Sequence, residues 1–139
     1  MTKEKRLKYV PVPDFNLIAI ASSEDAYRLS WVINQLFGIQ LKRTEPLRVW
    51  DEKTENPRDF VCYTYTSASQ QSDCRLISNK SESGLLESKY SKFDYFLQIR
   101  HFPGFQMTEL VEQLNTQKDI LMAVQITSPG KALTQKLMI

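Results

Sequence analysis

The sequence holds few of the residues on which most catalytic and metal sites depend. Its 139 residues include one histidine, His101, and two cysteines, Cys62 and Cys74. A structural zinc site usually takes four Cys or His ligands, so one copy of the chain cannot supply them. A Ser-His-Asp or Cys-His catalytic unit would have to use His101. We therefore expect no metal site and no cofactor.

Phosphate-binding loops and membrane segments are also missing from the sequence. The four glycines are scattered singly, so neither G-x-x-x-x-G-K-S/T nor G-x-G-x-x-G occurs. No apolar run approaches the ~20 residues that a membrane-spanning helix needs. No apolar segment follows the basic start, which is therefore not typical of a signal peptide. Two cysteines are too few for a disulfide framework, and we expect a cytoplasmic protein without membrane contact.

Charge and hydrophobicity indicate one folded domain. The chain has 18 Lys and Arg against 16 Asp and Glu, a formal net charge of +2, which argues against a broad nucleic-acid-binding surface. Hydrophobic residues make up 42% of the chain, enough for one core. Residues 1–14 are charged and proline-containing, and they predict a mobile arm, with Leu7–Val10 as an optional edge strand. Residues 15–139 predict a single domain.

The first half of the domain begins with a strand and a helix. Asn16–Ala21 is a short apolar run typical of a strand buried on both faces. A helix is predicted over residues 23–37, capped by Ser22 or Ser23, with Glu24 and Asp25 in its first turn. Gly38 is a suitable residue to end it. The apolar positions recur at helical spacing: Ala26, Leu29, Ile33 and Leu36.

The remaining chain predicts mostly short strands. They are residues 40–43, 47–50, a hairpin of 59–66 with 74–78, 93–100 and 120–126; residues 51–58 and 79–84 are predicted loops. Residues 85–92 are predicted as a helical turn or an irregular crossover. Thr108, followed by Glu109, is predicted to cap a second helix, and a tail is expected after Gly130. The order of elements predicts an α+β fold. We expect a mixed, largely antiparallel sheet of about five to seven strands, with two main helices packed on one face.

Two groups of residues are candidates for chemistry or small-ligand binding. His101 could act as a general base oriented by Asp94 or Glu109, although an exposed or half-buried histidine at a strand end is the commoner situation. A pocket between the sheet and the helices could be lined by polar residues from separate segments: Arg28, Lys80, Glu87, Asp94 and His101. The loop that contains Lys80 is more often a plain connector.

Other candidates have an ordinary structural reading as well. Tyr63 and Tyr65 could stack on RNA bases beside the basic arm, but core packing is favoured for them. Trp31, beside Tyr27 and Arg28, could line a pocket or a subunit contact, but packing against the sheet is favoured. Cys62 and Cys74, on opposite arms of the predicted hairpin, are interpreted as buried apolar residues rather than a redox pair. The acidic residues of the first loop are interpreted as solvated rather than as a cation site: Asp51, Glu52, Glu55 and Asp59.

Several segments, taken in order, resemble the IPExxxVDY family. They are F-N-L-I-A-I-A-S-S, A-Y-R-L-S-W-V-I-N, F-G-I-Q-L-K-R, L-I-S-N-K and F-D-Y-F-L-Q-I-R. Phe93-Asp94-Tyr95 stands at the V-D-Y part of the name-giving motif, and Leu85-Leu86-Glu87 is the best match to I-P-E. The family comprises small bacterial proteins, mainly from the Bacteroidetes, with no assigned activity. The resemblance covers about residues 15–126. It implies a soluble cytoplasmic protein and transfers no catalytic residue.

Three functions follow from these observations, in order of preference. The first is a non-enzymatic module that binds itself or another protein through the outer sheet face, the first helix or a sheet edge, so the expected partner is a second copy or another protein. The second is a small-ligand-binding protein or enzyme that uses the pocket described above, with a ligand that the sequence does not identify. The third is an RNA-associated protein, against which the near-neutral charge argues.

Overall fold

The computed structural model describes residues 14–69, 72–102 and 104–138. The predicted arm, including its optional strand at Leu7–Val10, lies outside the described residues except for Asp14. The elements, in chain order, are β1 (Asn16–Ala21), α1 (Ala26–Phe37), β2 (Lys42–Arg43), β3 (Leu47–Asp51), β4 (Asn56–Phe60), β5 (Cys62–Ser67), β6 (Ser72–Ser78), β7 (Lys80–Ser81), β8 (Gly84–Leu85), the 3-10 helix η2 (Ser88–Tyr90), β9 (Tyr95–His101), α2 (Met107–Asn115), β10 (Met122–Ile126) and α3 (Lys131–Leu137).

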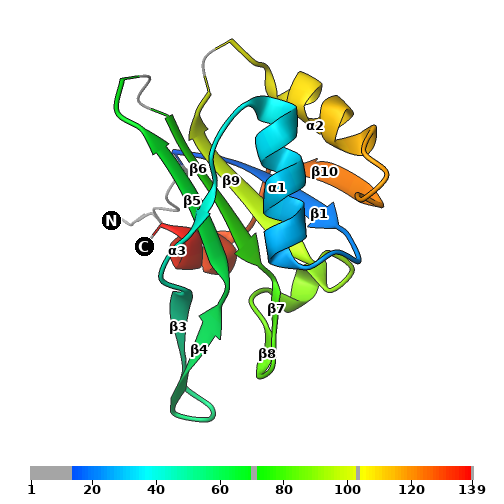
Figure 1. Cartoon of the computed structure of the whole chain (residues 1–139). Coiled ribbons are helices and arrows are strands. Elements are labelled where there is room, and N and C mark those ends of the chain that lie inside the picture. The colour runs from blue at the N-terminus through cyan, green and yellow to red at the C-terminus, as the bar shows by residue number, and fades with distance from the viewer. Residues whose placement is uncertain (1–13, 70–71, 103, 139) are drawn as a thin grey trace, which may run out of the picture.

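One six-stranded sheet, in the order β10-β1-β9-β6-β5-β2, forms the centre of the molecule. Every pairing in it is antiparallel, so the prediction of a largely antiparallel sheet is confirmed, whereas the predicted mixture with parallel pairs was wrong. Two small hairpins, β3–β4 and β7–β8, extend from one end of it (Figure 1). The predicted α+β class and strand number are therefore confirmed, and α1 and α2 pack on one face, as expected. No helix within the described ranges combines the length and the apolar character required to cross a membrane.

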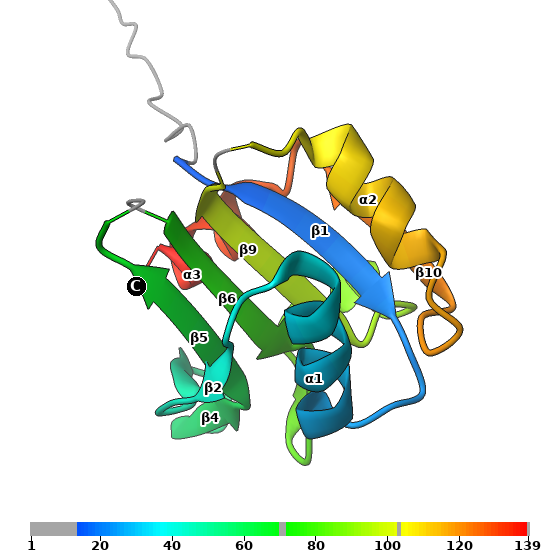
Figure 2. The ribbon, with the colours of Figure 1, turned by 45° about the horizontal axis from the view of Figure 1, so that its top comes forward.

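Alternation along the strands sends side chains into two cores. On the front face, Ile18, Ile20, Leu97 and Ile99 contact α1 and α2, which lie in front of the sheet in Figure 1. On the back face, the next residues along the same strands contact α3, the β3–β4 hairpin and the segment around η2; they include Leu17, Ala19 and Phe96. Figure 2 shows α2 lying along β1 and β10 at one side of the sheet. Both faces of β1 are buried, which explains its continuous apolar sequence.

The predicted first helix is confirmed, with a different cap. Helix α1 begins after Asp25, whose side chain accepts a hydrogen bond from the Arg28 backbone N–H. Ser22 lies outside the helix because its N–H and hydroxyl are used elsewhere, so the predicted serine cap was wrong. Gly38 ends the helix at φ 68°, the left-handed conformation that glycine adopts most readily. In α2 the cap is Gln106, in a capping box with Glu109, rather than the predicted Thr108.

Three segments form elements that the sequence did not predict. The predicted loop at residues 79–84 contains β7 and the start of β8, which pair in a short hairpin. Asn56–Phe60 is β4, although its first three residues were assigned to a loop, and it pairs with β3 in a hairpin outside the main sheet. Proline is tolerated in such an edge strand, so Pro57 does not prevent pairing. The predicted C-terminal tail contains α3. Its buried residues, Leu133, Thr134 and Leu137, pack on the back face of the sheet.

A buried polar contact holds the end of α3 against the sheet. The Leu137 carbonyl accepts hydrogen bonds from Arg75 Nη2 at 2.8 Å and Gln98 Nε2 at 2.9 Å. Arg75 Nε also donates to Gln98 Oε1 at 2.9 Å. The last carbonyls of a helix have no hydrogen-bond donor within the helix. Here Arg75 of β6 and Gln98 of β9 donate to the Leu137 carbonyl. This contact explains why a polar pair, Arg75 and Gln98, lies side by side in the sheet.

Candidate functional site

Exposed apolar side chains are concentrated where β10 begins. Three of the eight large exposed hydrophobic residues in the described chain are Leu121, Met122 and Val124, and Leu121 is 74% exposed. We call these three residues the β10 strip. Met122 and Val124 pair with Ala21 and Ala19 of β1, so their side chains lie on the back face of the sheet, at its outer strand. The sequence assigned residues 120–126 to a buried strand and did not identify this strip as exposed.

Next to the start of β10, a hollow of about 370 Å³ separates α1 from the α2–β10 loop. The Arg28 guanidinium lies 4.7 Å from the centre of the Trp31 ring, and its Nη2 is 3.4 Å from Asp119 Oδ2. Arg28 is therefore stacked on the indole ring of Trp31 and also paired with Asp119 in the α2–β10 loop. Both Trp31 and Tyr27 are exposed, at 46% and 71%. The favoured prediction that Trp31 packs on the sheet was therefore wrong, because Trp31 lies about 200° around the helix from the buried Leu29.

Ser22 connects three of the predicted pocket residues at this end of the sheet. Its N–H donates to Asp94 Oδ2 at 2.8 Å, and its hydroxyl donates to the Asp119 carbonyl at 2.6 Å. Asp94 Oδ1 is 2.7 Å from Lys80 Nζ, and the Asp119 side chain pairs with Arg28. Arg28, Lys80 and Asp94 therefore belong to one chain of contacts. Each carboxylate in it already has a partner, which is the arrangement of a structural network.

His101 lies far from this network. It is the exposed last residue of β9, whereas Asp94 immediately precedes that strand. A seven-residue strand at about 3.3 Å per residue separates them by roughly 20 Å. Glu109 does not orient His101 either, because its carboxylate accepts a hydrogen bond from the Gln106 N–H. The structure thus does not bring together the groups of the predicted acid–base unit.

Side chains fill the space in which a pocket was expected. The front core between the sheet and the helices consists of fully buried apolar residues such as Ile18, Ile33 and Leu97. Tyr63 belongs to this core, and Tyr65 packs against it half-buried. The two tyrosines therefore lie on the helix-covered face of the sheet, where Tyr63 has almost no surface for a base to stack on.

Glu87 is positioned by an asparagine that the sequence did not single out. The Glu87 carboxylate caps η2, and its backbone N–H donates to Asn79 Oδ1 at 2.9 Å. Asn79 is fully buried, and its Nδ2 donates to the carbonyls of Tyr90 and Phe93, both at 3.0 Å. The signal that was available is a strand ending in asparagine directly before a polar loop, a position at which an amide can bond several backbone groups.

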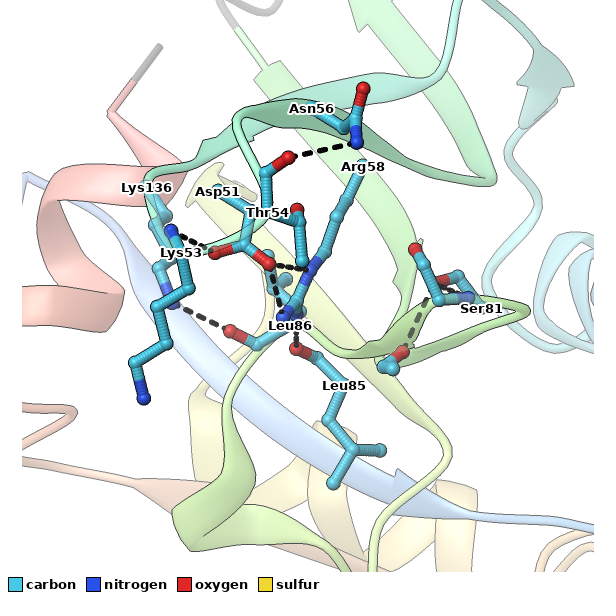
Figure 3. Close-up of polar contacts among 11 residues, drawn as sticks. Asp51, Lys53, Thr54, Asn56, Arg58, Ser81, Leu85, Leu86 and Lys136 are labelled. Atoms are coloured by element: carbon cyan, nitrogen blue, oxygen red, sulfur yellow. Dashed lines mark hydrogen bonds and ion pairs between the residues drawn. The ribbon is translucent and has the colours of Figure 1, made fainter.

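The predicted acidic loop contains two ion pairs. Arg58 bonds Asp51 through Nε and Nη2, and its Nη1 donates to the Leu85 carbonyl at 3.0 Å (Figure 3). The Lys53 backbone N–H and the Arg58 guanidinium lower the pKa of Asp51. The second pair joins Asp59 to both guanidinium arms of Arg48. No group of three or more potential metal ligands is found within the described ranges.

The two cysteines do not form a redox pair in this arrangement. Both are free and buried, Cys74 in the front core and Cys62 in the back core, so they lie on opposite faces of the sheet. Burial raises the pKa of the Cys74 thiol from 9.0 to about 12. A thiol in this state is not the thiolate that nucleophilic or redox chemistry requires. The interpretation as buried apolar residues is confirmed.

Asparagines from the two front helices contact the outer strands of the sheet. Asn115 of α2 accepts from the Ala123 N–H and donates to the Ala123 carbonyl, both at 2.9 Å. Asn34 of α1 makes the same pair of bonds with Leu41, at 2.7 and 3.2 Å. These contacts could not be predicted from the sequence, because each depends on which backbone atoms the sheet leaves unpaired.

No family model, curated protein or solved structure matches this chain. The resemblance to the IPExxxVDY family therefore stays a prediction from the segments quoted above. The function has to be argued from the surface of the molecule itself.

Proposed function

We propose that this protein is a non-enzymatic, self-associating module of the bacterial cytoplasm, and that two copies meet at the β10 strip. The observation that carries the proposal is the exposure of three apolar side chains: Met122 and Val124 on an outer strand of the sheet, and Leu121 directly before that strand. Contiguous apolar surface costs free energy in water, and covering it stabilises an assembly.

The charge pattern supports a second copy as the partner. Residues 120–130 contain no Lys, Arg, Asp or Glu. Outer strands usually carry charges that prevent association, and this one carries none. A charged partner would form no ion pair with such a surface. A second copy would present the same apolar side chains across a two-fold axis.

The chemistry of the other candidate groups supports a non-enzymatic role. His101 is an exposed residue at the end of β9, opposite Asp73, and the predicted carboxylates, Asp94 and Glu109, have ion-pair or backbone partners. Two buried free thiols are what a reducing compartment allows, which supports the cytoplasmic assignment. The bacterial origin rests on the resemblance to the IPExxxVDY family.

The test is the molar mass in solution as a function of concentration. Three side chains cover less than the ~800 Å² per partner of a typical stable interface, so we expect a weak dimer that forms as concentration rises. Light scattering should show a mass that increases toward twice that of one chain. Leu121→Lys and Val124→Lys, at exposed positions, should keep the mass at that of one chain.

Trp50→Lys is the matched control, because Trp50 is 59% exposed on the distant β3–β4 hairpin. It should associate like the wild type. A wild type with the mass of one chain at every concentration would overturn the proposal of self-association. An equal effect of Trp50→Lys would show that association does not use the β10 strip.

A further inference from the structure

The outer side of β10 is occupied by a side-chain amide in place of a neighbouring strand. Asn115 Oδ1 accepts from the Ala123 N–H and Asn115 Nδ2 donates to the Ala123 carbonyl. A strand paired at this position would make the same two bonds. Asn115 Nδ2 also donates to the Val111 carbonyl at 3.0 Å, which holds the amide in this orientation on α2.

These contacts fix which backbone groups of β10 point outward. Because the Ala123 N–H and carbonyl bond Asn115, they are directed away from β1. Backbone groups alternate along a strand, so those of Met122 and Val124 point toward β1, and those of Gln125 point outward like those of Ala123. Beyond Asn115, the outer edge of β10 therefore offers a second donor and acceptor at Gln125.

The opposite edge of the sheet has the same contact and additional protection. Asn34 bonds the backbone of Leu41, directly before β2. Strand β2 itself has only two residues, Lys42 and Arg43, and both are basic and exposed. Short length and positive charge each prevent strand addition. The β10 edge has five residues and no charge; within the described chain, α2 lies along β10 and supplies Asn115, whose amide bonds the outward groups of Ala123.

We propose that the outer edge of β10 is a strand-pairing surface for a second copy of this chain, kept closed by Asn115. Antiparallel pairing about a two-fold axis at Val124 would set Ala123 of each copy opposite Gln125 of the other. The outward groups of the two strands would then form four N–H···O bonds. The same register sets Met122 opposite Ile126, an apolar pair, with no like charges opposed. This inference goes beyond the proposed function, which uses side chains and leaves the edge closed.

The test compares Asn115→Ala with Asn34→Ala, which removes the equivalent pair of bonds at the protected edge. Light scattering should give Asn115→Ala at least twice the mass of the wild type at the same concentration, whereas Asn34→Ala should keep the wild-type mass. In Asn115→Ala the Ala123 and Gln125 amides should exchange with solvent quickly at low concentration and slowly at high concentration. Exchange at Gln125 reports strand pairing itself, since association through the β10 strip does not protect this amide.

A second variant separates pairing from misfolding. Proline lacks an N–H, and the Gln125 N–H points away from β1, so Gln125→Pro removes an outward donor without removing a bond to β1. Asn115→Ala/Gln125→Pro should return to the wild-type mass. An Asn115→Ala protein with the mass and Gln125 exchange of the wild type would overturn the proposal. Aggregation that Gln125→Pro leaves unchanged would also overturn it, because the association would then not be strand pairing.

Discussion

Asn79 links the end of β6 to the segment that crosses to β9. Its side chain accepts from the Glu87 N–H and donates to the carbonyls of Tyr90 and Phe93. Asn79→Ala would leave these three groups without that partner, and each unsatisfied buried group costs about 1–3 kcal/mol. We expect the free energy of unfolding to fall by at least about 3 kcal/mol, measured by urea denaturation. Asn56→Ala is the control, because the exposed Asn56 side chain donates one hydrogen bond, to the Thr54 carbonyl. This substitution should lower the free energy of unfolding by less than about 1 kcal/mol.

Cys74 and Tyr95 make the fold sensitive to alkali. Burial raises the pKa of Cys74 from 9.0 to about 12 and that of Tyr95 from 10.0 to about 12. The folded state favours the neutral forms of both groups. Their contribution to the free energy of unfolding is therefore complete below the pKa values of the unfolded chain, and it is lost as the pH rises toward 12. The melting temperature should fall above about pH 9. Cys74→Val should shift the onset of the fall toward pH 10, where Tyr95 begins to contribute; an unshifted onset would contradict this assignment.

Single residues were predictable where only their own burial mattered. The two cysteines and His101 lie as their types suggest, because small apolar residues are buried and a histidine at a strand end meets solvent. Arg28, Lys80 and Asp94 were predicted to line a pocket, and they lie instead in one chain of contacts through Ser22, which was assigned to a helix cap. Its true partners, Asp94 and Asp119, are far away in the sequence, so local spacing contains no information about them.

At the scale of elements, Arg58 attaches the β3–β4 hairpin to the β7–β8 hairpin. It bonds Asp51 within its own hairpin and the Leu85 carbonyl in the other. Arg58→Ala should therefore increase amide exchange across residues 47–60 while the main sheet keeps its protection. Arg48→Ala removes an exposed ion pair with Asp59 that joins β3 to β4 only. Such pairs contribute about 0.2–1 kcal/mol, so this control should leave exchange in the hairpin nearly unchanged.

Elements were predictable when their own periodicity was strong. Helix α1 has apolar residues on one face through three turns, and its sequence specifies a helix without reference to its surroundings. The β3–β4 hairpin contains Pro57 and many charges, a composition typical of loops. It forms because Arg58 bonds β8 and because Leu47 and Phe60 pack with α3 in the back core. Helix α3 is too short to be stable alone and depends on the back face of the sheet.

At the scale of the whole molecule, α3 closes the back core. Leu133 is fully buried there with Leu17 and Phe96. Leu133→Ala should lower the free energy of unfolding by about 2–5 kcal/mol, the usual cost of a cavity at a buried leucine. Leu121→Ala, at a highly exposed leucine, should change it by less than about 0.5 kcal/mol. Equal effects of the two substitutions in urea denaturation would show that α3 does not close a core.

The class of the fold was predictable from the order of elements, and the order of strands was not. Two amphipathic helices among short alternating strands can both bury their apolar faces on one face of a single sheet. The insertion of β1 between β9 and β10 depends on contacts between distant parts of the chain. The proposed interaction surface depends on the same topology, because it makes β10 an outer strand. No residue in β10 signals that position.

The place of β1 in the sheet also has a consequence for synthesis on the ribosome. Ile20 pairs with Tyr95 on one side and with Ala123 on the other, and both are translated long after β1 has left the exit tunnel. Throughout that interval the nascent chain carries an apolar strand without either of its hydrogen-bonding neighbours. Such sequence-distant pairing slows folding, and exposed strands promote aggregation in the meantime. Leu17–Ile20 therefore lacks both neighbouring strands until β9 and β10 have been translated, and we expect chaperones to bind this segment during that interval.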